Sequence, residues 1–253
     1  MESSKEIGRW SSNAYLCIVY DCQESRTAAI GNGKLERRLF MIEPYQFHSI
    51  KHQVYQLVRT YQSVNDPRTI KTVETMTKDA IEQFFSEEET APREILAAFF
   101  QPGMTINRSN ELLTELKEYV RPFQVPTTKQ IEKIFRKVKK LKIPDFASVD
   151  LKETTYLSWD DIGSQSKFMI IATEQGFTGL HGHVSTEVKK GICPLCQHEG
   201  NVSMFLSLTK SNGDGTYTKR GNYICRDSQR CNQQMEQPAK LHDFVSLLQM
   251  KDK

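Results

Sequence analysis

Four cysteines near the C-terminal end constrain the fold of this chain more than any other feature. Cys193 and Cys196 enclose two residues, whereas Cys225 and Cys231 enclose five. A CxxC turn allows both sulfurs to point at one ion, and clustered cysteines in a reducing compartment are typical of metal sites. Four thiolates suit tetrahedral Zn²⁺, with Zn–S bonds of about 2.3 Å. The spacing therefore predicts one zinc ion held by these four side chains.

Such a site is expected to be structural. Four protein ligands leave no open position for a catalytic water, so zinc binding would contribute directly to folding. A knuckle, then a β-hairpin, then ligands near the start of a terminal helix are typical of a treble-clef zinc finger. The wide second pair departs from the common CxxC spacing. Buried thiols without metal and an iron–sulfur cluster remain alternative interpretations.

The other cysteines and the histidines give weaker signals. His198 could replace a cysteine ligand, and His181 and His183 would share one face of a strand, but surface positions without a role are the favoured interpretation for all three. Cys17 and Cys22 are expected to have no structural role. No apolar run reaches the roughly 18 residues of a membrane helix, and we find no signal peptide. We therefore expect a cytoplasmic protein with reduced thiols.

Residues 41–120 show the periodicity of amphipathic helices. Apolar side chains recur at spacings of three and four in two stretches, which are separated by Asn65-Asp66-Pro67, where Asp66 is a suitable N-cap. Pro92 can start a short third helix, and a fourth apolar stripe runs from Leu112 to Val120. Four helices joined by short turns predict a small helical bundle.

Pro122 and Pro126 mark the predicted boundary to a second domain, residues 121–253. A lysine-rich helix is expected over residues 127–142, ended by Pro144. Short β-rich runs follow it at Lys167–Thr173, Gly176–Val184 and Val202–Leu208, and a turn at Ser211–Gly215 leads to a returning strand at Tyr217 and Tyr223–Cys225. The predicted fold class is therefore α+β. An N-terminal helical bundle precedes an α/β domain that contains the zinc finger at about residues 190–250.

Residues 1–40 lack sustained periodicity and are expected to be a disordered extension or a translated leader. Glu36-Arg37-Arg38 can be encoded by GAA-AGG-AGG, a bacterial ribosome-binding sequence, and Leu39 and Phe40 would supply a short spacer before Met41. On this hypothesis translation starts at Met41. A mobile N-terminal tail is the alternative.

Several stretches closely resemble one protein family, the elongation factor G-binding proteins, or FusB-type fusidic acid resistance proteins. They are Pro122-Phe123, the run Lys137–Pro144, Gly200-Asn201-Val202-Ser203, the run Lys219–Ser228 with Cys231-Asn232, and Val64-Asn65-Asp66. The resemblance extends from about Met41 to the C-terminus. The wide spacing of Cys225 and Cys231 fits that family, and residues 1–40 have no counterpart in it.

The resemblance implies a fold, a partner and an activity. Members of the family combine a helical bundle with a four-cysteine treble-clef zinc finger. They bind elongation factor G mainly through the zinc domain and promote its release from the ribosome, which protects translation from fusidic acid. They are not enzymes. The zinc ligands of the family map to Cys193, Cys196, Cys225 and Cys231.

The resemblance also implies contact positions for the partner. These map to Arg220, Tyr223 and Phe244. Ile192 stands where the family can carry an aromatic residue, a departure that would weaken binding there. Exposed arginine and aromatic side chains often anchor interfaces. Without the resemblance, the pattern favours a core position for Phe244, and strand packing is the alternative for Tyr223.

RNA binding by the lysine-rich helix is a second hypothesis. Its basic side chains could neutralise phosphates of ribosomal RNA, although a solvated helix face is the usual explanation of such a run. The formal net charge of +3 does not by itself indicate an acidic partner. The candidate RNA-binding residues are Lys133, Arg136, Lys137 and Lys140.

We expect no catalysis. The sequence offers no phosphate-binding loop, nucleophile elbow or open metal site, and adjacent carboxylates such as Asp160 and Asp161 rarely converge on one substrate. The expected partners are elongation factor G and, transiently, the ribosome. The protein is expected to be a monomer with no small-molecule substrate.

Overall fold

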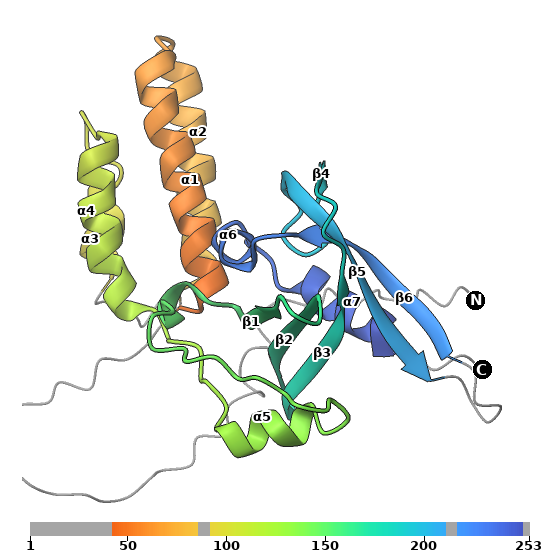
Figure 1. Ribbon diagram of the computed structural model, residues 1–253. Coiled ribbons are helices and arrows are strands. Elements are labelled where there is room, and N and C mark those ends of the chain that lie inside the picture. The colour runs from red at the N-terminus through yellow and green to blue at the C-terminus, as the bar shows by residue number, and fades with distance from the viewer. Residues whose placement is uncertain (1–41, 86–91, 211–216, 250–253) are drawn as a thin grey trace, which may run out of the picture.

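A computed structural model of the chain describes residues 42–85, 92–210 and 217–249 (Figure 1). Cys17, Cys22 and the proposed start at Met41 lie outside these residues, as does the turn predicted at Ser211–Gly215. Within the described ranges, no helix is both long and apolar enough to cross a membrane.

The second helix of the N-terminal part begins at the expected cap, whereas the fourth begins at Ile106, ahead of the predicted stripe from Leu112 to Val120. Asp66 caps the second helix, because its carboxylate accepts the backbone N–H groups of Arg68 and Thr69 at 3.2 and 3.1 Å. Thr105 caps the fourth in the same way through the N–H of Arg108. The helices are α1 (Pro44–Ser63), α2 (Pro67–Glu82), α3 (Arg93–Ala98) and α4 (Ile106–Leu116), followed by the 3₁₀ turn η1 (Lys117–Tyr119).

The apolar stripes of these helices form one hydrophobic core. Ile50, Val54 and Val58 of α1 are fully buried and pack in a cluster with residues of α3 and α4. A parallel bridge between Ile42 and Val120 joins the start of this part to its end. The four predicted helices are therefore present and share a core.

The C-terminal part is built on one antiparallel six-stranded sheet. Strand β5 is its longest member, and β3 and β4 pair with successive segments of one edge of β5 while β6 pairs with the other. The runs predicted as strands fall in β2, β3, β5 and β6, whereas β1 and β4 were not predicted. The strands are β1 (Tyr156–Asp161), β2 (Ser166–Thr173), β3 (Gly176–Val184), β4 (Lys189–Ile192), β5 (Glu199–Lys210) and β6 (Tyr217–Cys225).

Helix α5 (Thr128–Ile134) is shorter than predicted. It begins at the Thr127 cap but ends at Ile134, so the expectation of a helix through residue 142 is wrong. At Phe135 the backbone leaves the helical region, and the Phe135 ring packs edge-on against Trp159 and Phe168, with centroids 5.7 and 5.2 Å away. Burial of this aromatic cluster against the sheet outweighs the helix propensity of the lysines that follow.

Glycine at one position allows α5 to approach the sheet. A Cβ atom at Gly179 of β3 would lie 2.2 Å from the Ile134 side chain, so a larger residue there would push α5 away. Of the four candidate RNA-binding residues, only Lys133 belongs to the helix. Arg136, Lys137 and Lys140 lie in the turns after it.

Two helices complete the C-terminal part, α6 (Ser228–Gln233) and α7 (Ala239–Gln249). Helix α6 lies between β1 and α1 (Figure 1). The short 3₁₀ helix η2 (Leu151–Glu153) also contacts the helical part. There, Lys117 pairs with Glu153 at 2.6 Å, and the ring Nε2 of His48 lies 3.1 Å from the Glu153 carbonyl oxygen. The two parts of the chain are thus in direct polar contact.

Candidate zinc centre and partner-binding surface

Three separate elements bring the four cysteines together. Cys193 and Cys196 lie in the knuckle after β4, Cys225 is the last residue of β6, and Cys231 lies in α6. In the knuckle, the N–H of Cys193 donates to His198 O and the N–H of Gln197 donates to Cys193 O, at 3.0 and 2.8 Å. This small hairpin turns both of its thiols toward the end of β6.

The N-terminus of α6 positions the fourth cysteine. The Asp227 carboxylate accepts the N–H groups of Gln229 and Arg230, at 2.9 and 3.2 Å, and so starts the helix directly after β6. Cys231 follows one turn later, with its N–H on Asp227 O at 3.1 Å. The five residues between Cys225 and Cys231 are therefore needed to leave the strand and complete the first helical turn.

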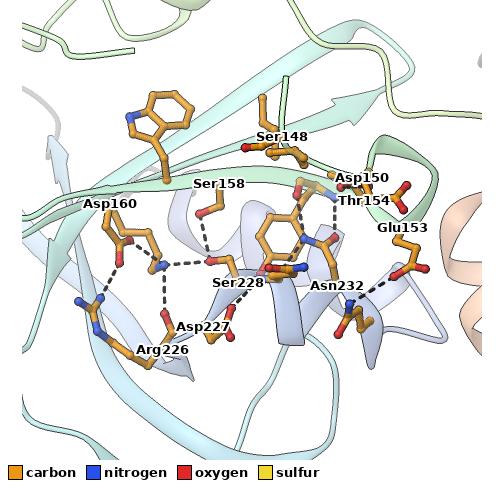
Figure 2. Close-up of a pocket in the computed structure, with 17 residues that line it drawn as sticks. Ser148, Asp150, Glu153, Thr154, Ser158, Asp160, Arg226, Asp227, Ser228 and Asn232 are labelled. Carbon is orange, nitrogen blue, oxygen red and sulfur yellow. Dashed lines mark hydrogen bonds and ion pairs between the residues drawn. The ribbon is translucent and has the colours of Figure 1, made fainter. Parts of the chain in front are cut away.

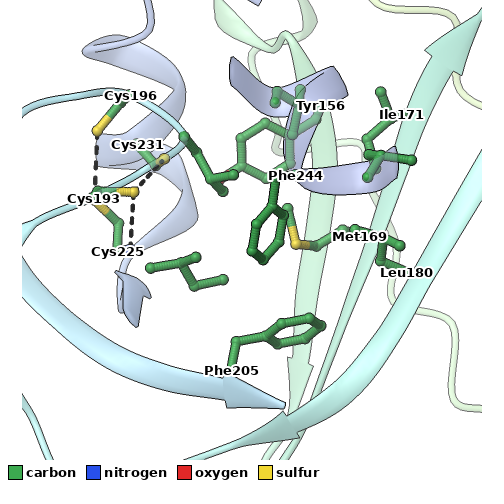
Figure 3. Close-up of a cluster of buried hydrophobic side chains, with 14 of the residues drawn as sticks. Tyr156, Met169, Ile171, Leu180, Cys193, Cys196, Phe205, Cys225, Cys231 and Phe244 are labelled. Atoms are coloured by element: carbon green, nitrogen blue, oxygen red, sulfur yellow. Dashed lines mark hydrogen bonds between the residues drawn. The ribbon is translucent and has the colours of Figure 1, made fainter. Parts of the chain in front are cut away.

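The sulfur positions fit a tetrahedral zinc ion. The sulfurs of Cys193 and Cys231 are 3.9 Å apart, and those of Cys196 and Cys225 are 3.7 Å apart (Figure 3). Zn–S bonds of about 2.3 Å place tetrahedral sulfurs roughly 3.8 Å from one another, whereas a disulfide requires about 2.05 Å. All four side chains are buried and free of disulfides. The cluster has the size and chemistry of a four-thiolate zinc site.

The cysteines influence one another's protonation. Hydrogen bonds from the three neighbouring thiols lower the pKa of the Cys193 thiol far below its ordinary value. The same contacts raise the pKa of Cys225 and of Cys231. The pKa of the Cys196 thiol is lowered as well, so thiolates are favoured at Cys193 and Cys196 but not at all four positions together, because like charges oppose one another. A bound divalent cation would supply the charge that allows all four to ionise.

The predicted partner contacts differ in their exposure. Ile192 is 69% exposed, and Tyr223 and Arg220 are partly exposed. Phe244 is 4% exposed and packs near Phe205, with ring centroids 6.2 Å apart (Figure 3). The assignment of Phe244 as a surface contact is therefore wrong. It is a core residue of α7, as its helical pattern alone favoured.

The histidines are not zinc ligands in this cluster. The ring Nδ1 of His198 lies 2.7 Å from the Cys196 carbonyl oxygen, and its other nitrogen faces away from the sulfurs, toward Glu236. His181 stacks on Phe168 with centroids 4.6 Å apart, while His183 is exposed. The two strand histidines therefore do not form a site together.

A pocket of about 440 Å³ lies between β1 and α6 (Figure 2). Three of its charged side chains pair with one another: Asp160 contacts the ammonium group of Lys167 at 2.8 Å and the guanidinium group of Arg226 at 2.7 Å. Asp161 instead caps the following turn through Gly163 and Ser164. The two adjacent carboxylates point to different partners and do not converge.

Asn232 is the structural residue that sequence reasoning missed. It is buried behind Cys231, and its side-chain amide bonds to the backbone of β1. The only signal available was the Cys231-Asn232 pair in the family resemblance, which gave no indication of this role.

Comparisons with known proteins agree with this geometry. A family model described as the N-terminal part of elongation factor G-binding proteins matches residues 41–124. A second, described as a C-terminal treble-clef zinc finger, matches residues 131–247. Among solved structures, the chain is similar to the fusidic acid resistance protein FusC, with 38% sequence identity and a TM-score of 0.78 over 83% of this chain and 98% of that chain. No curated protein sequence matches.

Taken with the four clustered cysteines, these matches confirm the α+β class, the treble-clef zinc finger and one structural zinc ion. The four clustered cysteines are the group that could hold this ion.

Proposed function

Because this chain belongs to the elongation factor G-binding protein family, we propose that it binds elongation factor G and promotes release of that factor from the ribosome, thereby protecting translation from fusidic acid. The observation that carries the proposal is the succession of both family matches along one chain, together with sulfur spacings that fit zinc. The similarity to FusC over nearly all of that chain supports the connection with fusidic acid. The proposed activity is binding without chemical change of the drug.

The proposed contact surface surrounds the free edge of β6. Tyr223 and Arg220 are three residues apart on this strand, so their side chains leave opposite faces. Both faces can be reached from the edge of a sheet, and β6 has β5 on one side only among the described strands. A partner that packs along this edge could therefore contact both residues.

Neighbouring groups hold these side chains in place before binding. The ammonium group of Lys189 lies 5.6 Å from the centre of the Tyr223 ring, and an Arg220 guanidinium nitrogen donates to Leu247 O at 3.1 Å. Zinc fixes the end of β6 through Cys225, two residues after Tyr223. Anchors that are ordered in advance lose less conformational entropy on binding. Zinc would thus support affinity without touching the partner.

Release of the factor requires a difference in affinity. By linkage, a protein removes a factor from the ribosome only to the extent that it binds the departing form more tightly than the ribosome-bound form. We propose that the zinc domain makes this distinction, and that the proposed contact with the ribosome is transient.

Calorimetric titration of the zinc-loaded full chain into elongation factor G tests the proposal. One-to-one saturable binding is expected, together with faster dissociation of the factor from ribosomes in the presence of fusidic acid. Absence of binding at micromolar concentrations would overturn the proposed partner. Binding without any change in dissociation would leave the partner in place and refute the release mechanism.

A further inference from the structure

Three potential metal ligands that are far apart in the sequence meet where α1 contacts the zinc domain. They are His52 of α1, His198 of the knuckle and Glu236 between α6 and α7. One atom from each side chain lies within 4.8 Å of the other two. Two imidazoles and one carboxylate are a ligand set that suits zinc and related divalent ions.

The distances place Glu236 at the centre of the group. Its Oε1 atom lies 2.6 Å from Nδ1 of His52 and 3.5 Å from Nε2 of His198. Zinc bonds of about 2.0–2.1 Å to nitrogen or oxygen set tetrahedral ligand atoms roughly 3.4 Å apart. The distance between Glu236 Oε1 and His198 Nε2 already has about this value. A movement of less than about 1 Å that separates His52 Nδ1 from Glu236 Oε1 would give the second pair the same distance.

Hydrogen bonds leave the required lone pair on His198. Its Nδ1 lies 2.7 Å from Cys196 O, and a carbonyl oxygen can only accept, so Nδ1 carries the hydrogen. In the neutral ring Nε2 is then the unprotonated nitrogen, and this is the nitrogen that faces Glu236. A metal-bound histidine typically donates its other N–H to a carbonyl group in the same way.

His52 presents a shielded nitrogen to the same place. Its Nδ1 is enclosed by protein and has no aligned hydrogen bond among the described residues, although Glu236 Oε1 is 2.6 Å away. On the other side of the ring, Nε2 lies 2.9 Å from the amide of Gln56. When His52 Nδ1 binds a cation, the hydrogen of the ring is on Nε2. Rotation of the Gln56 amide then places its oxygen toward Nε2, where it can accept this hydrogen.

We propose that His52, His198 and Glu236 form a second site for a divalent metal ion of the zinc type, separate from the four-cysteine site. The ion takes one nitrogen from each ring and one carboxylate oxygen, and water fills the fourth position. Any hydrogen on Nδ1 of His52 is released as a proton when the metal binds.

The two sites are coupled through the chain. His198 follows Cys196 by two residues and Glu236 follows Cys231 by five, so the first zinc ion orders two of the three ligands of the second. His52 comes from the helical part. An ion at the second site therefore joins the two parts of the protein and stabilises their contact.

Equilibrium dialysis of the full chain, with its four-cysteine site loaded, tests this proposal. Bound zinc is measured at micromolar free zinc for the wild type, His52→Ala and Glu236→Ala. The wild type is expected to hold two equivalents. Both variants are expected to keep the first equivalent and to bind the second at least about tenfold more weakly, because each loses one of three ligands. His183→Ala, which removes an exposed histidine elsewhere, is the matched control.

Thermal unfolding supplies a second measurement. Added zinc is expected to raise the Tm of the wild type and the His183→Ala variant but not that of His52→Ala, since only a ligand that binds the folded state stabilises it. A wild type that holds one equivalent overturns the proposal. So does a second equivalent that survives in both variants, or one that is lost equally in the control.

Discussion

Asn232 and Tyr156 exchange two hydrogen bonds across the contact between α6 and β1. The Asn232 Oδ1 atom accepts the N–H of Tyr156 at 3.0 Å, and its Nδ2 donates to Tyr156 O at 3.0 Å (Figure 2). Oδ1 also accepts the N–H of Thr155 at 2.7 Å. One amide therefore substitutes for a neighbouring strand at the start of β1, directly beside the zinc ligand Cys231.

Replacement of Asn232 is expected to be costly. Asn232→Ala leaves the buried backbone groups of Tyr156 without partners, and each unsatisfied group costs about 1–3 kcal/mol. We expect a loss of about 2–4 kcal/mol in the free energy of unfolding, measured by urea denaturation in the presence of zinc. Asn201→Ala, at an exposed position on β5, should change stability by less than about 0.5 kcal/mol. Equal losses in the two variants would contradict the assigned role.

The two members of the Lys167–Asp160 ion pair should respond differently to mutation. The Lys167 side chain is 2% exposed and that of Asp160 is 25% exposed, and Asp160 has a second partner in Arg226. Asp160→Asn leaves a buried ammonium group without its counter-ion, whereas Lys167→Met leaves Asp160 paired with Arg226. Urea denaturation should show a loss of about 3–5 kcal/mol for Asp160→Asn and a smaller loss for Lys167→Met. The reverse order would show that Lys167 does not depend on Asp160.

Acidification should destabilise the protein partly through His48. Burial lowers the pKa of His48 below its ordinary value of 6.5, so the unfolded chain binds more protons than the folded protein between the two values. The contribution of neutral His48 to the free energy of unfolding is therefore fully present above about pH 6.5. It is lost as the pH falls from there toward the pKa of His48 in the folded protein. Urea midpoints of His48→Gln should depend less on pH there than those of the wild type.

Other histidines contribute to the same dependence of stability on pH. Burial also lowers the pKa of His181 and of His242, so His48→Gln should reduce the pH dependence without abolishing it. Protonation of the zinc ligands affects all variants alike and cancels in the comparison. His183→Gln, which removes an exposed histidine, is the matched control. A pH dependence of His48→Gln identical to that of the wild type would count against burial of His48 as the cause.

Mutation of Tyr223 tests the proposed partner surface directly. Tyr223→Ala is expected to weaken binding to elongation factor G by about 1–3 kcal/mol, or roughly 5- to 150-fold, if the ring is an interface anchor. Calorimetry supplies the affinity, and Met76→Ala on α2, which removes a side chain at a 65% exposed position, is the control. Unchanged affinity would assign Tyr223 to strand packing alone.

Loss of one zinc ligand should unfold part of the molecule. Cys225→Ser is expected to release zinc, unfold the zinc domain and abolish binding to elongation factor G while the helical bundle stays folded, because metal binding is coupled to folding of the domain that holds it. Metal analysis and circular dichroism measure the two effects. A variant that lacks zinc and still binds its partner would refute the structural role of the metal.

The elements with local signals could be predicted from the sequence. Asp66 and Thr127 start their helices as expected, and the cysteine spacing indicated the metal and its four ligands. The end of α5 depends on how Phe135 packs against Trp159 and Phe168, which come from distant strands. Local propensity contains no information about such contacts.

Other features have no periodic signal at all. Strand β4 has four residues, and β1 ends in Asp160 and Asp161, so neither contains a sustained apolar run. The group of His52, His198 and Glu236 exists only because α1 packs beside α6. Tertiary contact between segments more than a hundred residues apart cannot be read from one sequence without related sequences.

The pairing of β3 with β5 spans three residues of each strand, Gly182–Val184 against Phe205–Ser207. On one side of this short pairing, β1, β2 and β3 follow one another through tight connections. On the other side, β4 ends directly before Cys193, β5 begins three residues after Cys196, and β6 ends at Cys225. We therefore expect a newly made chain to assemble the first three strands before zinc binds, and to add the remaining strands once the metal holds the cysteines beside them. During that interval β3 would be an unpaired edge open to pairing with other chains, so we expect a low supply of zinc to lengthen the time for which each new molecule is exposed to aggregation.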